Sequence, residues 1–140
     1  MKIIVAPQSF KGSLSAKEAA NIISQSVSEI FPEAEIVQIP IADGGDGTLE
    51  TIIDATDGQI MTTNVTGPLN DNINAPWGLF ESADSKKTAI IEMARSSGLA
   101  LLDPEKLNPY LATTYGTGEL ILEAINSGCK KIILGIGGSA

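Results

Sequence analysis

A glycine-rich turn at residues 43–47 carries two carboxylates, Asp43 and Asp46. Glycines at positions 44, 45 and 47 let the backbone approach a ligand closely. Two carboxylates on one tight turn could hold Mg²⁺ through oxygen ligands, or accept a proton from a substrate hydroxyl group. A structural turn in which Asp46 or Thr48 caps the next helix is the alternative. The density of glycine and aspartate favours the functional interpretation.

A polar cluster of Ser9, Lys11 and Ser13 stands directly before a predicted helix. An ammonium group and two hydroxyls beside a helix N-terminus could bind a phosphate or a carboxylate. The serines could instead cap the helix while Lys11 stays in solvent, and the residues alone favour this interpretation. The position of the cluster at the predicted carboxyl edge of the sheet leaves both interpretations open.

The segment 92–98 follows an apolar strand and is predicted to be a polar loop. It contains Arg95, the only arginine of the chain, together with Ser96. A guanidinium group can bind a substrate carboxylate through two parallel hydrogen bonds, so both residues are candidates for substrate binding. A surface arginine without a ligand is the alternative.

Two further glycine-rich stretches are candidates for nucleotide or phosphate binding. Thr117 and Gly118 open a predicted helix, whereas Gly137, Gly138 and Ser139 follow an apolar strand. Backbone amides at such turns can bind an anion, although Thr117 could simply be a helix cap. Neither the G-x-x-x-x-G-K-[ST] loop nor the G-x-G-x-x-G fingerprint of dinucleotide-binding proteins is present.

Histidine is missing from the sequence, and Cys129 is the only cysteine. These facts exclude Ser-His-Asp and Cys-His catalysis, His-ligated metal sites and a disulfide within the chain. Acid–base chemistry must therefore use carboxylates, lysine, tyrosine or water.

The first third of the chain predicts a parallel sheet. Strand patterns at residues 2–7 and 35–40 alternate with helix patterns at residues 13–31 and 48–56. This β-α-β-α order is typical of parallel strands joined by right-handed crossovers.

The first predicted helix has a clear start and a clear apolar face. Ser15 followed by Glu18 is a capping box, and Pro32 ends the helix. The apolar residues that recur at helical spacing and are predicted to face inward are Ala16, Ala19, Ala20, Ile23, Val27, Ile30 and Phe31.

The alternation of strand and helix patterns ends at Gly58. Residues 59–66 and 73–80 predict a hairpin around a Gly67-Pro68 turn, because no helix pattern separates them. The remaining patterns are a strand at 88–94, a proline-marked connection at 103–110, a helix at 117–127 and a last strand at 131–136.

These patterns predict an α/β fold with a Rossmann-like parallel sheet and helices on both faces. Residues 1–58 and 97–140 would form this portion, which is incomplete, and residues 59–96 would be part of a β-rich inserted subdomain. Four polar clusters follow four apolar strands. If the strands are parallel, all four clusters lie at the carboxyl edge of one sheet, where open α/β folds bind ligands.

Composition narrows the classes of function. The 140 residues, 43% hydrophobic, are enough for about one domain. A net charge of −8 argues against binding to nucleic acid or to an anionic membrane. No apolar run approaches the ~20 residues that cross a bilayer, and the start of the chain does not resemble a signal peptide. We expect a cytoplasmic protein.

Taken in order, six segments of the chain resemble those of the bacterial-type glycerate kinases, often called type 1. They are "MKIIVAPQSFKGSLSAKEAA", "IPIADGGDGTLE", "VTGPL", "IEMARSSGL", "NPYLATTYGTGELI" and "IILGIGGSA". The match covers essentially the whole chain.

The resemblance implies ATP-dependent phosphorylation of D-glycerate with Mg²⁺. Phosphoryl transfer depends on positioning and charge neutralisation, which suits these residues. Lys11 or Arg95 could bind the glycerate carboxylate, and an aspartate could interact with a glycerate hydroxyl group. Asp43 and Asp46 could bind the metal ion. Lys11, Asp43 and Asp46 are therefore the candidate catalytic residues.

Two features depart from the family pattern. Gln8 stands where the family motif "APDSFK" has aspartate, and an amide is a weaker base and Mg²⁺ ligand. Family members are also much longer, so we expect an N-terminal portion that is inactive alone, and a truncated sheet that self-associates through exposed edges. The alternative is a non-catalytic α/β binding or regulatory module. A nicotinamide-dependent oxidoreductase is disfavoured because its fingerprint is missing.

Overall fold

The computed structural model describes residues 1–10 and 13–140, which form two units, Met1–Asp43 and Gly44–Ala140. Each unit combines helices with parallel strands, so the predicted α/β class is confirmed. The division predicted from the sequence, residues 1–58 with 97–140 and residues 59–96, differs from these units and stays a prediction.

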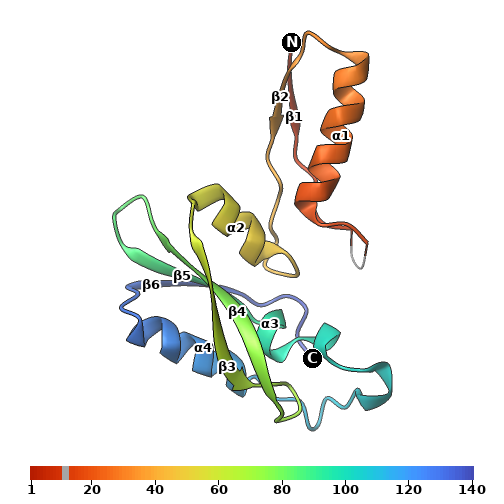
Figure 1. The fold of residues 1–140 in the computed structure, drawn as a ribbon. Helices are drawn as coiled ribbons and strands as arrows, with labels where there is room; N and C mark the ends of the chain where they lie inside the picture. Colours follow the sequence, from red (N-terminus) through yellow and green to blue (C-terminus); the bar gives the residue numbers. More distant parts are fainter. Residues whose placement is uncertain (11–12) are drawn as a thin grey trace. The chain divides into compact units, whose positions relative to one another are not determined.

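The first unit is a parallel pair of strands covered by one helix (Figure 1). β1 (Lys2–Val5) pairs with β2 (Glu35–Gln38), and α1 (Ala16–Ile30) connects them. Ser15 caps α1 as predicted: its hydroxyl accepts the N–H of Glu18 at 3.1 Å, and the Glu18 carboxylate accepts the Ser15 N–H at 2.8 Å.

The inward face predicted for α1 is only partly right. Four small residues of the helix are buried, namely Ala16, Ala19, Ala20 and Ser24. Ile23, Ile30 and Phe31 are exposed by 39%, 71% and 46%. A sheet of two strands is too narrow to cover the whole apolar face of a helix, which explains the difference.

The second unit contains a four-stranded mixed sheet in the order β3-β4-β5-β6. β3 (Gln59–Thr66) and β4 (Asn72–Glu81) form the predicted hairpin, and β5 (Lys87–Glu92) pairs antiparallel with β4. β6 (Lys131–Gly135) pairs parallel with β5. The expectation of one sheet is wrong for the described residues, because β1 and β2 form a separate two-stranded sheet.

Helices cover both faces of this second sheet (Figure 1). α2 (Thr48–Thr56) packs on β4 and β5 with Leu49 and Ile53 against Ile90. On the opposite face, α4 (Tyr115–Asn126) packs with Leu120 and Ala124 against a cluster that includes the buried Trp77. Burying such large apolar side chains stabilises a fold by about 1.5–3 kcal/mol each.

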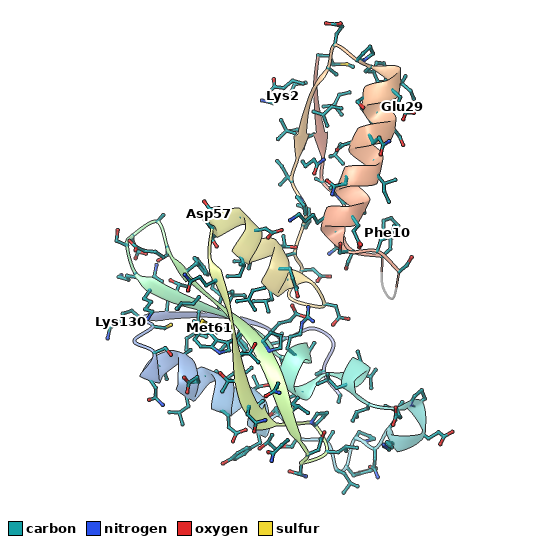
Figure 2. The ribbon with its side chains drawn as sticks, viewed as in Figure 1. Lys2, Phe10, Glu29, Asp57, Met61 and Lys130 are labelled. Carbon is teal, nitrogen blue, oxygen red and sulfur yellow. The ribbon has the colours of Figure 1, made fainter. Side chains whose placement is uncertain are left out.

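Two local expectations are corrected. The polar loop predicted at residues 92–98 contains a short helix, α3 (Ala94–Ser97), followed by the 3₁₀ turns η1 (Leu99–Leu101) and η2 (Pro104–Lys106). α4 starts at Tyr115 with Thr114 at the N-cap position, so Thr117 lies inside the helix and is not its cap. Figure 2 draws the side chains on the same view, with Asp57 at the end of α2 and Met61 on β3.

Candidate functional site

Three polar segments of the second unit meet at the carboxyl ends of β5 and β6. Glu92, the last residue of β5, is in register with Gly135, the last residue of β6. The backbone then continues this pairing: the Met93 N–H bonds to the Gly135 carbonyl at 2.8 Å, and the Leu99 N–H bonds to that of Gly138 at 2.9 Å. The prediction that these two segments share one sheet edge is confirmed.

The glycine turn before α2 packs directly on the end of β6. The Gly137 N–H donates to the Gly44 carbonyl at 2.8 Å. A Cβ atom at Gly135 would lie 2.7 Å from the Gly44 carbonyl oxygen, and one at Gly137 would lie 2.7 Å from the Cα of Gly45. Such distances exclude side chains, so glycines are required here for two backbones to approach each other.

Asp46 lies where these two glycine turns meet. It is exposed, and a Cβ atom on Gly138 would lie 3.6 Å from its Oδ1 atom. The turn itself is held by the Thr48 hydroxyl, which accepts the Gly44 N–H at 3.0 Å. The turn therefore presents a carboxylate beside an exposed glycine-serine segment.

Asp43, Ser9 and Lys11 belong to the other part of the chain. Asp43 and Ser9 are exposed residues of the first unit. Lys11 lies outside the described residues. Their predicted roles in catalysis, metal binding and substrate binding stay predictions.

Glu92 is a buried carboxylate that links β5 to α2. Its side chain is fully buried, and its Oε2 atom accepts the N–H of Leu49 at 3.0 Å. Burial raises the pKa of the Glu92 carboxyl above its ordinary value; the Leu49 N–H and the charge of Arg95 oppose this shift, and Glu50 and Asp46 add to it.

Glu92 is not among the predicted site residues. Its signal in the sequence is a carboxylate at the end of an otherwise apolar strand. Burial of a carboxylate costs free energy unless hydrogen-bond donors contact it. A carboxylate at this position therefore indicates a specific structural or functional role.

Arg95 is held by two carboxylates of the second unit. Its Nη2 atom donates to Oε1 of Glu50 at 2.6 Å, and its Nε atom lies 3.3 Å from Oε1 of Glu92. The side chain is about one third exposed, at 33%. A substrate carboxylate would have to share this guanidinium group with Glu50, so the predicted substrate contact stays a prediction.

Ser96 and Thr117, two of the predicted site residues, contact each other in the interior of the second unit. The Ser96 and Ser97 hydroxyls each lie 2.9 Å from the Thr117 hydroxyl, and all three residues are buried. This cluster ties α3 to α4. The observed contacts are structural, and the predicted contacts with substrate or nucleotide stay predictions.

The other candidates for phosphate binding are accessible. Gly118, Gly138 and Ser139 are exposed, whereas Gly137 is half-buried and donates its N–H to the Gly44 carbonyl.

Across residues 1–10 and 13–140, the structure groups no three His, Cys, Asp or Glu side chains in a way that could hold a metal ion. None of the helices in this part of the chain has the length and hydropathy needed to span a membrane.

Comparisons with known proteins agree on one family. A sequence profile described as the glycerate kinase family matches residues 3–140. Over 140 residues, the chain is 54% identical to the glycerate 2-kinase of Escherichia coli (strain K12) and 49% identical to the glycerate kinase of Bacillus subtilis (strain 168).

A solved structure is similar over the same range. It is a crystal structure from Salmonella typhimurium LT2 of a protein with the provisional name glycerate kinase 2. The TM-score is 0.80 at 49% sequence identity, over 99% of this chain and 36% of that one. The alignments with the two curated relatives include the whole of this chain but only 36% of the length of each relative.

Proposed function

The chain belongs to the glycerate kinase family, and we propose that the protein carrying it transfers the γ-phosphoryl group of ATP to a hydroxyl group of D-glycerate. The observation that carries this proposal is the junction of two glycine turns with Asp46 between them. Together with the family membership, this junction supports phosphoryl transfer, because such catalysis needs close backbone contacts with phosphates and a positioned carboxylate.

The reaction assigns a role to each candidate residue. A glycerate hydroxyl oxygen attacks the γ-phosphorus, the bond from that phosphorus to the ADP oxygen breaks, and ADP leaves. The hydroxyl proton goes to an aspartate carboxylate, for which Asp46 and Asp43 are the candidates. Lys11, Ser9, Arg95 and Ser96 are proposed for the glycerate side, and the phosphates are proposed to bind at a second set of residues: Thr117, Gly118, Gly137, Gly138 and Ser139.

Mg²⁺ fits the donor set that the chain offers. Mg²⁺ in phosphoryl-transfer sites is usually bound by one or two protein carboxylates together with waters and substrate phosphates, so it does not need a cage of three protein ligands. Asp43 and Asp46 are the proposed ligands. When bound, the ion would neutralise charge on the phosphate oxygens.

An assay of ADP release tests the proposal in the protein expressed from its natural gene, with D-glycerate and Mg-ATP. We expect ADP formation that depends on glycerate. We also propose that the 140-residue chain alone gives no turnover, because it spans about a third of the length of its relatives. Glycerate-dependent turnover by the isolated 140 residues would contradict this second statement.

Gln8 favours one alternative, a non-catalytic module that binds glycerate or nucleotide. Position 8 is exposed and carries an amide where the family motif has a carboxylate. Calorimetric binding of Mg-ATP or glycerate by the natural protein without any ADP release would support this alternative. Restoration of turnover by Gln8→Asp would show that the fold is that of a kinase disabled at one residue.

A further inference from the structure

We propose that Glu92 is a positioning residue for the phosphoryl transfer proposed above: it anchors the N-terminus of α2, and through it the turn that carries Asp46, to the end of β5. The inference rests on that proposed function. Glu92 itself is buried and would act through Asp46 without touching the substrate.

The first link is a hydrogen bond that replaces a local helix cap. Helix N-termini usually have a side chain that accepts one of their free N–H groups. In the described structure α2 has Gly47 at its N-cap and no side-chain cap bond of its own. Glu92 supplies the acceptor from another element, because its Oε2 atom bonds to the Leu49 N–H at 3.0 Å. A carboxylate at this end of a helix also interacts favourably with the helix dipole.

The second link runs through Arg95 to the same turn of α2. Glu92 Oε1 and Arg95 Nε are 3.3 Å apart, and the Arg95 Nη2 atom bonds to Glu50 at 2.6 Å. Glu50 and Leu49 are neighbours in the first turn of α2. The charged groups that act on the Glu92 carboxylate are Arg95, Glu50 and Asp46. The start of α2 is therefore attached to the β5–α3 segment at two adjacent residues.

The geometry connects this anchor to both glycine turns. Asp46 stands three residues before Leu49, so any displacement of the α2 N-terminus moves its carboxylate. The backbone of Glu92 pairs with Gly135, which fixes the second glycine turn. The Glu92 side chain thus helps to fix Asp46 relative to the segment 135–139, together with the hydrogen bond from the Gly137 N–H to the Gly44 carbonyl. Because a misplacement of about 1 Å can cost about a hundredfold in rate, such an anchor matters for catalysis.

The test compares Glu92→Ala, Glu92→Gln and a matched control in the protein expressed from its natural gene. The control is Glu119→Gln, because Glu119 also accepts a backbone N–H from a distant element, that of Thr66 at 2.7 Å. Two readouts are needed: kcat with KM for glycerate and for ATP, and hydrogen exchange of the backbone amides followed by mass spectrometry. The second readout does not depend on activity.

We expect E92A to lower kcat by at least about tenfold with both KM values within about threefold, as for an interaction that matters mainly in the transition state. Exchange should increase in peptides covering residues 44–49 and stay unchanged in β4 and α4. E92Q keeps an oxygen acceptor for Leu49, so its loss of kcat and its exchange should lie between those of E92A and the natural protein. E119Q should keep kcat within about twofold, with its exchange increase confined to residues near Thr66.

Three results would overturn the proposal. They are a kcat of E92A within about twofold of the natural protein, an exchange increase spread evenly over residues 44–140, and an equal loss of kcat in E119Q. Absence of glycerate-dependent turnover in the natural protein would instead contradict the proposed function. The exchange data would then still decide whether Glu92 anchors residues 44–49.

Discussion

Asp46 is an exposed carboxylate on a turn whose backbone is fixed on both sides. The Gly44 N–H bonds to the Thr48 hydroxyl, and the Gly44 carbonyl accepts the Gly137 N–H. An acidic side chain on a rigid support is preorganised for contact with a ligand, because little conformational entropy is lost when the contact forms. This is the physical reason for assigning Asp46 the central role.

Replacement of Asp46 by Asn should lower kcat of the natural protein by about a hundredfold or more, because an amide cannot accept the hydroxyl proton. The matched control is Asp57→Asn at the other end of α2 (Figure 2), where the residue is exposed and has a φ of 49° that Asn tolerates. D57N should keep its kcat. Equal activity of D46N and D57N in the ADP-release assay would contradict the assignment.

Glu92 makes stability depend on pH in a direction that follows from its burial. Its pKa in the folded protein is raised from the ordinary value of 4.5, so the folded state holds this proton more tightly than the unfolded state. The contribution of Glu92 to the free energy of unfolding is therefore greatest below pH 4.5, and it declines as the pH rises through the interval up to the raised pKa.

Glutamine does not titrate, so E92Q should lack this decline. We expect the free energy of unfolding of E92Q, relative to the natural protein, to increase between pH of about 4 and about 7. Urea titrations at several pH values measure it. A constant difference, or one that changes in the opposite direction, would show that the buried carboxylate does not have a raised pKa.

At the scale of elements, the site depends on the contact between the turn before α2 and the end of β6. Replacement of Gly135 by Ala places a methyl group 2.7 Å from the Gly44 carbonyl oxygen, so one of the two backbones must move. We expect G135A to lose about 1–3 kcal/mol of unfolding free energy, as overpacked sites do. Chemical denaturation of the natural protein and of G135A measures this difference in unfolding free energy.

Gly118→Ala is the control for this substitution. A Cβ atom at Gly118 meets nothing within 4 Å, and the residue lies inside α4. Alanine should therefore leave stability unchanged or increase it by up to about 1 kcal/mol. If G135A were as stable as G118A, the close approach of the two turns would not be a feature of the protein in solution.

Elements with strong local signals were predictable from the sequence. α2 has the predicted bounds of residues 48–56, and the hairpin of β3 and β4 follows from alternation and the Gly67-Pro68 turn. The apolar face of α1 was overestimated, since its burial depends on the width of the sheet. α3 was missed because four residues in a polar segment carry no helical period.

The site was predictable only where strand order decides it. Parallel pairing of β5 and β6 places segments 92–98 and 135–140 together, as the sequence suggested. The contact of Glu92 with Leu49 joins residues that are 43 positions apart, and that of Ser96 with Thr117 spans 21 positions. Nothing local in the sequence indicates such pairs, because they depend on how helices pack on the sheet.

At the scale of the whole molecule, the described chain leaves many apolar side chains in solvent. On β6, which is an edge strand, three large residues are exposed by 36–44%, namely Ile132, Ile133 and Leu134, and Ile136 directly after the strand is exposed by 68%. Exposed apolar edge strands pair readily with another chain. These observations agree with the self-association that we expect from the sequence.

The 140-residue chain, studied alone, should therefore self-associate. Sedimentation velocity between about 1 and 100 µM should show species larger than a monomer, the concentration range in which exposed apolar surface drives association. Ile133→Lys should shift the distribution toward monomer, whereas Lys17→Arg, an exposed position on α1, should not. A stable monomer across the whole range would contradict the expectation.

The most direct test of the central claim is glycerate-dependent phosphoryl transfer by the protein expressed from its natural gene. Incubation with D-glycerate and Mg-ATP should give ADP and a phosphoglycerate in equal amounts, identified by phosphorus NMR. Both products should be lost in D46N and kept in D57N. Formation of no phosphoglycerate by the natural protein, or its undiminished formation by D46N, would contradict the account.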